Sequence, residues 1–331
     1  MRTVATSFLG KAKGLALSPR YTSVIVTFLL LVTMFAIGAG RYDNFASGQN
    51  ILNLFIDNAF LIVLAVGMTF VILTGGIDLS VGSVVALSTM ITASLARAGW
   101  PPMLVILIVL VTGATIGLLS GLAIHIFKIQ PFIATLAAMF FARGFCYIID
   151  LKSIPITDPF FTALAQRIKI APGLSISSSV IIAMVVVIVA VVVLHFTRTG
   201  RTVYGIGGGE HSAVLMGLPV ARTKVLVYVI SGFCSAVAGL LFALYTRSGY
   251  GLTGVGLELD AIAAVVIGGT LLTGGYGFVV GSLLGVLLLG VIQTIINFEG
   301  TLSSWWTKIV IGALLLIFIV LQRVLSLRRR T

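Results

Sequence analysis

Paired glycines stand beside polar residues at two places in an otherwise apolar chain. The string LTGGIDLSVGS occupies 73–83 and the string LTGGYGFVVGS occupies 272–282, with seven of eleven positions identical. Glycine adopts backbone angles that other residues avoid, and the side chains of Asp78 and Ser80 suit the cap of a following helix. The first string therefore predicts either a tight capped turn between helices or an unwound stretch whose backbone amides meet a polar solute. Gly277 stands where the first copy has Asp78, so the two copies are not chemically equivalent.

Candidate groups for such a pathway combine the two strings with two ionisable residues inside apolar stretches. The full set is Asp57, Thr74, Gly75, Gly76, Asp78, Ser80, Arg143, Thr273, Gly274, Gly275 and Ser282. Ionisable residues within a membrane face protein or water as a rule. Arg143 either extends outward toward Asp150 or pairs with Asp57 as a gate contact. Asp260 has a simpler interpretation, because a carboxylate at the start of a helix favours the helix dipole.

Side-chain patterns that carry catalysis or bind metals are absent from the sequence. His125, His195 and His211 are isolated, and no HExxH, GxSxG or Walker A motif occurs. Cys146 and Cys234 lie in apolar stretches, where cysteine is typical of a small core residue rather than a disulfide or a metal ligand. The sequence therefore predicts neither an enzyme nor a metal site, and it holds no ATPase of its own.

The composition requires membrane helices to hold these groups. Of 331 residues, 59% are hydrophobic and 9% are charged, and the mean hydropathy is +1.19. A bilayer core about 30 Å thick needs about 20 apolar residues per helix, and these stretches lack the alternation of barrel strands. We predict a single all-α polytopic membrane domain over 1–331, with about ten transmembrane helices and an internal repeat of glycine-broken helix pairs. Chance similarity in a glycine-rich chain is the alternative to a repeat. The predicted spans are 22–40, 51–73, 80–97, 103–125, 131–149, 179–196, 225–246, 258–272, 279–297 and 305–322.

The net charge of +12 is spread in a way that is typical of membrane topology rather than of nucleic-acid binding. With the N-terminus inside, the inner segments carry Arg2, Lys11, Lys13, Arg20, Lys128, Arg198, Arg201, Arg222, Lys224, Arg323, Arg328, Arg329 and Arg330. The outer segments carry fewer cations, namely Arg41, Arg97, Lys152, Arg167, Lys169, Arg247 and Lys308. This excess predicts that both termini face the cytoplasm, with a tail over 1–22 and a basic tail over 323–331. The first apolar run exceeds the roughly 7–15 residues of a signal peptide, so we expect it to be retained.

Two segments between spans are long enough to carry structure of their own. The outer segment, 150–178, contains three prolines and predicts a short lid of turns with one helical turn. The inner segment, 197–224, contains three glycines at 207–209, followed by a stretch from Glu210 to Met216 that suits two helical turns. Gly217 and Pro219 follow as stop signals. Such a helix, apolar on one side, fits either a groove of another protein or the headgroup layer of the membrane.

Three strings give the chain a resemblance to a known family. They are AVGMTFVILTGGIDLSVGS at 65–83, RTVYGIGGGEHSAVLMGL at 201–218 and LDAIAAVVIGGTLLTGGYG at 259–277. They resemble the permease subunits of bacterial ATP-binding-cassette (ABC) monosaccharide importers of the ribose-permease type. Two further strings, GYGLTGVGLELDAIAAVVIGGTLL and INFEGTLSSWWTKIVIG, are similar to one permease of the galactofuranose importer.

The resemblance implies a transport subunit of the bacterial inner membrane that works by alternating access and carries out no catalysis. Its implied partners are a second, related permease, an ABC ATPase and a periplasmic sugar-binding protein, with the lipid bilayer around it. ATP and Mg²⁺ would bind to the ATPase, and no cofactor is implied within this chain. The segment 150–178 would be periplasmic. A stand-alone secondary transporter or channel for a neutral solute is the alternative function.

The resemblance also makes the segment 210–217 the coupling helix, which contacts the ATPase. Its residues are Glu210, His211, Ser212, Ala213, Val214, Leu215, Met216 and Gly217. Gly209, Glu210 and His211 stand where many family members have an asparagine and two alanines, so the contacts differ in detail. Trp305 and Trp306 are typical of a membrane-interface belt, with stacking on the sugar ring as the alternative.

Overall fold

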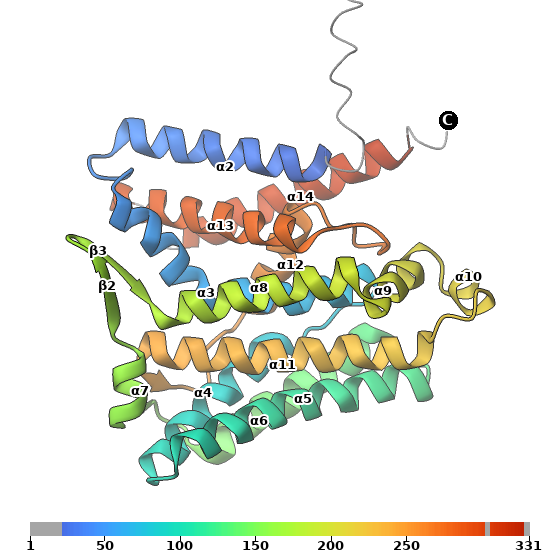
Figure 1. Cartoon of the computed structure of the whole chain (residues 1–331), viewed down its shortest axis with the longest axis horizontal. Coiled ribbons are helices and arrows are strands. Elements are labelled where there is room, and N and C mark those ends of the chain that lie inside the picture. Colours follow the sequence, from blue (N-terminus) through green and yellow to red (C-terminus); the bar gives the residue numbers. More distant parts are fainter. Residues whose placement is uncertain (1–21, 302–304, 328–331) are drawn as a thin grey trace, which may run out of the picture.

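Apolar stretches of this sequence form helices, because backbone hydrogen bonds within a bilayer must be satisfied inside the chain. The computed structural model describes residues 22–301 and 305–327, whose helices lie side by side as a bundle (Figure 1). The apolar helices are α2 (Thr22–Arg41), α3 (Gly48–Leu73), α4 (Val81–Arg97), α5 (Pro102–Ile126), α6 (Pro131–Ile149), α8 (Ser178–Phe196), α11 (Val220–Thr246), α12 (Leu257–Ile267), α13 (Val279–Glu299) and α14 (Trp305–Leu327).

Short elements mark the two ends of the bundle (Figure 1). One end, which we call the hairpin end, carries β1 (Ile154–Pro155), α7 (Pro159–Leu164) and the antiparallel pair β2 (Arg167–Ala171) and β3 (Leu174–Ser177). There β1 also pairs antiparallel with β4 (Ser248–Gly249). The opposite end, which we call the α10 end, carries α9 (Arg198–Gly208) and α10 (Glu210–Leu215).

The structure confirms the prediction of an all-α polytopic membrane protein. Each of the ten predicted spans coincides with one of the apolar helices, although α12 ends at Ile267 rather than at residue 272. Among the described residues, seven helices are long and apolar enough to cross a membrane, and α4 and α14 hold shorter apolar stretches. The number of ten crossings and the internal repeat therefore stay predictions. The tails at 1–21 and 328–331 lie outside the described residues.

Small residues allow the helices to pack closely. Gly113, Gly117 and Gly121 recur every fourth residue on α5 and face α11, where a Cβ on Gly117 would lie 2.2 Å from the carbonyl oxygen of Tyr228. Close backbone approach of this kind replaces the hydrophobic driving force that is missing between helices in lipid. Gly67 likewise allows α3 to pack closely against α11, and α3 is buried along most of its length.

Three irregular stretches separate helices inside the bundle, at 74–80, 250–256 and 268–278. The second stretch meets the start of α4, the helix that follows the first stretch, because a Cβ on Gly82 would lie 2.7 Å from the carbonyl oxygen of Gly254. Gly82 belongs to the first turn of α4, and Gly254 precedes α12 by three residues. The starts of α4 and α12 are therefore adjacent in space, although 176 positions separate Val81 from Leu257 in the sequence.

Candidate functional site

A separate short helix, α10, forms the tip of the α10 end (Figure 1). Of the three consecutive glycines, Gly209 alone divides the chain, because Gly207 and Gly208 continue α9. At the other end of α10, Gly217 has φ 74° and its N–H donates to the carbonyl oxygen of Val214 at 2.9 Å. The N–H of Leu218 donates to Ala213 at 3.1 Å, which completes a glycine-terminated helix end. The helix predicted over 210–216 and its stop signal are thus present.

The two sides of α10 differ sharply in exposure. Ala213 is fully buried against Ile206 and Val220, which holds the helix on the bundle. The next three side chains, those of Val214, Leu215 and Met216, are 55%, 75% and 66% exposed. His211 and Ser212 are exposed as well, and the carboxylate of Glu210 pairs with Lys224 at 2.7 Å. The arrangement presents an apolar tip on a short, well-anchored helix.

Helix α9 connects this tip to both glycine strings. A Cβ on Gly207 would lie 2.0 Å from the carbonyl oxygen of Leu73 and 2.1 Å from the amide nitrogen of Gly275. Backbone therefore touches backbone at this point, with no side chain between. One helical turn earlier, the hydroxyl of Tyr204 donates to the carbonyl oxygen of Gly277 at 2.7 Å. We call the contact of Gly207 with the two strings the glycine junction.

The two LTGG strings themselves lie side by side. The N–H of Gly275 donates to the carbonyl oxygen of Leu73 at 2.9 Å, and a Cβ on Gly75 would lie 3.3 Å from the carbonyl oxygen of Thr273. Gly75, Gly274 and Gly275 have φ values of 78°, 82° and 75°, which only glycine adopts without strain. The structure thus brings together the predicted residues Gly75, Thr273, Gly274 and Gly275 at the junction. Of the other two, Gly76 lies against Tyr228 of α11, and the hydroxyl of Thr74 donates to the carbonyl oxygen of Val71 within α3.

Asp78 is held inside the bundle rather than along an open channel in this structure. Its side chain is 1% exposed and accepts hydrogen bonds from the Ser80 amide at 2.9 Å, the Ser80 hydroxyl at 2.6 Å and the Ser231 hydroxyl at 2.7 Å. These bonds fix the turn before α4 and connect it to α11. In the second string, Ser282 is also buried, and its hydroxyl pairs with that of Thr69 at 2.7 Å.

Arg143 makes neither of the two contacts that the sequence suggested. One of its terminal nitrogens donates to the carbonyl oxygens of Gly251 at 2.6 Å and Thr253 at 2.7 Å, in the stretch before α12. Asp150 instead pairs with Arg97 at 3.3 Å. The backbone N–H of Lys152 and the Arg97 guanidinium hold the pKa of the Asp150 carboxyl below its usual value. Arg143 therefore fastens α6 to the irregular stretch that precedes α12.

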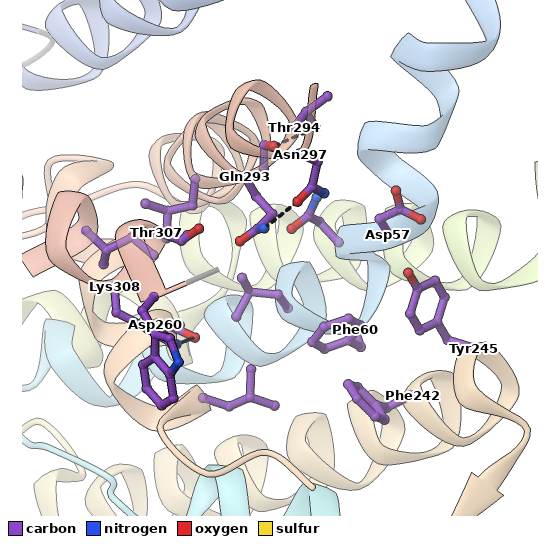
Figure 2. A pocket seen from close by; sticks show the side chains of 17 residues that line it. Asp57, Phe60, Phe242, Tyr245, Asp260, Gln293, Thr294, Asn297, Thr307 and Lys308 are labelled. Carbon is purple, nitrogen blue, oxygen red and sulfur yellow. Dashed lines mark hydrogen bonds and ion pairs between the residues drawn. The ribbon is translucent and has the colours of Figure 1, made fainter. Parts of the chain in front are cut away.

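Asp57 lines a cavity of about 500 Å³ between α3, α11, α12, α13 and α14 (Figure 2). Its carboxylate faces the side chain of Tyr245 from α11. On the other side of the cavity, Lys308 donates to both carboxylate oxygens of Asp260, at 2.6 and 2.8 Å. Asp260 therefore has a side-chain partner in addition to its place at the start of α12.

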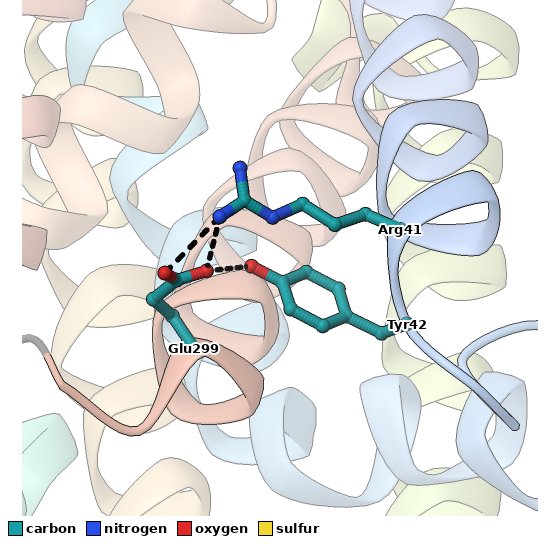
Figure 3. Close-up of polar contacts among 3 residues, drawn as sticks. All are labelled: Arg41, Tyr42 and Glu299. Carbon is teal, nitrogen blue, oxygen red and sulfur yellow. Dashed lines mark hydrogen bonds and ion pairs between the residues drawn. The ribbon is translucent and has the colours of Figure 1, made fainter.

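A polar cluster next to the cavity fastens the end of α13 to the end of α2 (Figure 3). The Arg41 guanidinium contacts the two carboxylate oxygens of Glu299 at 3.1 and 3.0 Å, and the hydroxyl of Tyr42 donates to the same carboxylate. This hydrogen bond raises the pKa of the Tyr42 phenol above its usual value. The cluster holds the part of α13 that contributes to the cavity wall.

Comparison with known proteins identifies the family of this chain. The family model described as branched-chain amino acid transport system, permease component, matches residues 50–319. The chain belongs to this permease family. It is 48% identical over 309 residues, 93% of both chains, to the inner membrane ABC transporter permease protein YjfF of Escherichia coli K12. It is 44% identical to the fructose import permease protein FruG of Bifidobacterium longum, over 97% of both chains. Identity to the ribose import permease protein RbsC of Haemophilus influenzae is 39%, over 92% of this chain and 94% of the relative. No solved structure matches.

The permease is therefore a multi-pass membrane transport subunit and not an enzyme, as the sequence predicted. The resemblance to permeases of the ribose type is confirmed as well. Among the described residues, no group of three or more His, Cys, Asp or Glu residues is placed to hold a metal ion.

Several residues that line the cavity of the permease were not predicted from the sequence. Gln293 and Asn297 lie four positions apart on α13, and Asn58 follows Asp57 on α3. Two amides at this spacing inside an apolar stretch lie on one face of the helix. This pattern could have indicated a polar site from the sequence. Tyr245 and Thr307 had no comparable signal, because hydroxyl residues are common at helix ends.

Proposed function

We propose that the permease is the transmembrane subunit of an ATP-driven importer that receives a monosaccharide from a periplasmic binding protein. Two relatives support the substrate class, because their names describe the import of fructose and of ribose. Within this class we propose galactofuranose as the sugar. That choice depends on the strings at 249–272 and 296–312, which resemble a permease of the galactofuranose importer.

The observation that carries the proposal is the apolar tip of α10. Val214, Leu215 and Met216 project from the end of the bundle, although Ala213 shows that α10 can bury apolar residues where the bundle offers a surface. Apolar residues that are exposed together mark a contact with a protein or with the membrane. A short helix that enters a partner's groove would bury them, and an ABC ATPase is the partner that this family requires. A solitary carrier has no need of such a helix.

Energy must then come from the partner. The chain contains no Walker A motif, and we propose that ATP and Mg²⁺ bind to the partner ATPase, with no cofactor in the permease. We propose that closure of two ATPase domains displaces α10 in this chain and in a second, related permease. Helix α9 passes the displacement to both LTGG strings through Gly207. The helices that follow the strings, α4 and α13, would then tilt and open the pathway toward one side at a time.

The same proposal sets the orientation in the bacterial inner membrane. The α10 end carries the basic segment 197–224 and therefore faces the cytoplasm, together with both termini. The hairpin end, which includes β2 and β3, faces the periplasm and the binding protein. The net charge of the chain reflects this topology, and no nucleic-acid partner is involved.

Reconstitution tests the proposal directly. The permease is inserted into liposomes with the second permease and the ATPase, and the binding protein is added outside with labelled galactofuranose, ribose, fructose or leucine. We expect uptake of one sugar that requires both ATP inside and the binding protein outside, and none of leucine.

Two results contradict the proposal. Uptake that persists with a hydrolysis-deficient ATPase means that the permease works as a solitary carrier or channel. Uptake of leucine in preference to every sugar assigns the permease to amino-acid transport. A single preferred sugar other than galactofuranose corrects the choice of sugar and leaves the mechanism in place.

A further inference from the structure

The cavity that contains Asp57 offers hydrogen-bonding groups that the protein itself leaves unused. The hydroxyl of Thr307 is 5% exposed and has no hydrogen-bond partner among the described residues. A buried polar atom of this kind is costly unless something bonds to it. Since Thr307 lines the cavity, its hydroxyl is available to a molecule inside (Figure 2).

The amide pair on α13 adds further groups. The side-chain nitrogen of Gln293 donates to the side-chain oxygen of Asn297 at 3.0 Å, which aligns the two amides (Figure 2). This bond leaves one acceptor on Gln293 and one amino group on Asn297 for a ligand. The amino group of Asn58 is bound to the carbonyl oxygen of Leu54 at 2.8 Å, so Asn58 presents its own acceptor. Donors and acceptors are thus mixed along the wall.

The charges in the cavity restrict what it can bind. Lys308 and Asp260 neutralise each other at 2.6 Å, which leaves Asp57 as the carboxylate without a cationic contact among the lining residues that the structure describes. A carboxylate accepts hydrogen bonds from hydroxyl groups and repels anions. A phosphorylated sugar would meet this repulsion, and the carboxylate of an amino acid would find no free cation among the described residues that line the cavity. A neutral molecule with several hydroxyl groups meets neither obstacle.

Aromatic rings complete the wall. Phe60 and Phe242 pack edge to face with ring centroids 4.7 Å apart, and Trp305, which is 75% exposed at the start of α14, also lines the cavity. Aromatic faces contact the C–H surfaces of a ring, while the polar groups between them fix its orientation. A cavity of about 500 Å³ is within the usual range for small-molecule sites.

We propose that this cavity is a binding site for a neutral monosaccharide on the hairpin-end side of the permease. The side chains that hold the sugar are those of Asp57, Asn58, Gln293, Asn297 and Thr307. The inference deepens the proposed function, which supplies the substrate class, and it adds the place where the sugar is bound within this chain.

Protection of a cysteine tests the site in the assembled importer. Ile311→Cys places a reporter in the cavity wall, while the native Cys146 and Cys234 are buried. A maleimide dye is applied without the binding protein, and labelling is read from the band of this chain. We expect methyl galactofuranoside, ribose or fructose to slow labelling saturably, and leucine to have no effect. Leu151→Cys, 73% exposed and outside the cavity, should label at the same rate with and without sugar.

A pair of threonine variants separates binding from structure. Thr307→Val removes the unused hydroxyl and should raise the half-protecting sugar concentration about three- to tenfold, the effect of one lost hydrogen bond. Thr294→Val is the matched control, because its hydroxyl lines the same cavity but already donates to Gly290 at 2.8 Å. It should leave the half-protecting concentration unchanged.

The possible results distinguish failure of the proposed binding site from failure of the proposed function. If ATP-dependent sugar uptake is normal but no sugar protects Ile311→Cys, the cavity is not the binding site and the proposed function stands. Equal effects of Thr307→Val and Thr294→Val, or protection by leucine, also overturn the site. Absence of sugar uptake by the wild-type assembly contradicts the proposed function instead.

Discussion

The backbone amide of Gly275 donates a hydrogen bond to the carbonyl oxygen of Leu73 at 2.9 Å, which joins the two LTGG strings at the α10 end. Gly207 of α9 lies against both residues, closer than any side chain would allow. Because α9 leads directly into α10, a displacement of the tip reaches both strings through contacts between backbones. Contacts between backbones transmit a displacement without rotation of side chains, so we propose that the glycine junction links docking of the ATPase to opening of the pathway.

The first prediction concerns this junction. Gly207→Ala puts a Cβ 2.0 Å from the carbonyl oxygen of Leu73, so α9 must move away from the strings. We expect a loss of stability of about 1–3 kcal/mol, the usual cost of overpacking, and less sugar transported per ATP hydrolysed. Thermal unfolding of the purified protein and paired uptake and hydrolysis assays measure the two effects.

The neighbouring glycine is the matched control for this prediction. A Cβ on Gly208 would meet nothing within 4 Å, so Gly208→Ala should keep both stability and the transport ratio. If the two variants behave alike, the junction carries no coupling and the role of Gly207 must be abandoned.

A second prediction concerns the tip of α10. Replacing Glu210 by Lys and Met216 by Arg puts cations on the face that the ATPase is expected to cover. The change should uncouple ATP hydrolysis from uptake, because burying an unpaired charge in an apolar groove is unfavourable. The protein should still fold and insert, since the Glu210–Lys224 ion pair is exposed and contributes less than about 1 kcal/mol.

Single variants of Met216 show whether the uncoupling comes from the apolar face of α10. Met216→Arg alone should reduce copurification of the ATPase, whereas Met216→Leu preserves an apolar side chain and should not. Normal uptake by the double variant would mean that α10 is not the contact with the ATPase. A membrane-surface role for the helix would then be the better interpretation.

The helices were predictable because a membrane span has one dominant requirement, a long run of apolar residues. The α10 helix was predictable for a different reason, since Gly217 and Pro219 are local stop signals whose effect does not depend on the rest of the fold. The end of α12 was not predictable in this way. Leu271 and Leu272 continue the apolar pattern past the end of the helix, but the helix ends before them, where Gly268 packs against Gly281 and Gly269, with φ 96°, packs against Ser23.

The site was less accessible to sequence reasoning, because its contacts involve backbone atoms or distant residues. Arg143 binds the carbonyl oxygens of Gly251 and Thr253, and a backbone acceptor leaves no trace in residue type or spacing. The cavity is formed by helices from both halves of the chain, so its lining depends on how α3 packs against α13. Asp57 was found because an acid inside an apolar stretch is conspicuous, whereas Thr307 is not.

A third prediction tests the packing of α5 on α11. Gly117→Ala places a Cβ 2.2 Å from the carbonyl oxygen of Tyr228, and helices that must separate lose contact along their whole length. We expect destabilisation of about 1–3 kcal/mol or more, measured by thermal unfolding in detergent. Gly144→Ala is the control, because nothing lies within 4 Å of its Cβ and alanine favours a helix interior by up to about 1 kcal/mol. Equal stability of the two variants would show that α5 and α11 are not in close contact.

The last prediction decides between the two interpretations of Asp78. In the structure its carboxylate accepts three hydrogen bonds, from the amide and hydroxyl of Ser80 and from the hydroxyl of Ser231. Asp78→Ala leaves these donors without partners inside the bundle, and we expect a loss of about 2–4 kcal/mol of stability. Asp78→Asn should cost less, because its oxygen can still accept from Ser80 and the Ser231 hydroxyl can rotate to accept from its amino group.

Transport by the asparagine variant completes the test of Asp78. A residue that only fixes the turn before α4 should allow near-normal ATP-dependent uptake once enough folded protein is reconstituted. Uptake that fails in Asp78→Asn despite wild-type stability would instead assign the carboxylate to the pathway. The Ser231→Ala variant separates these cases further, because it removes the bond to α11 and retains both bonds to Ser80. If Asp78 acts through the α4–α11 connection, Asp78→Ala should add less destabilisation in the Ser231→Ala background than in the wild type.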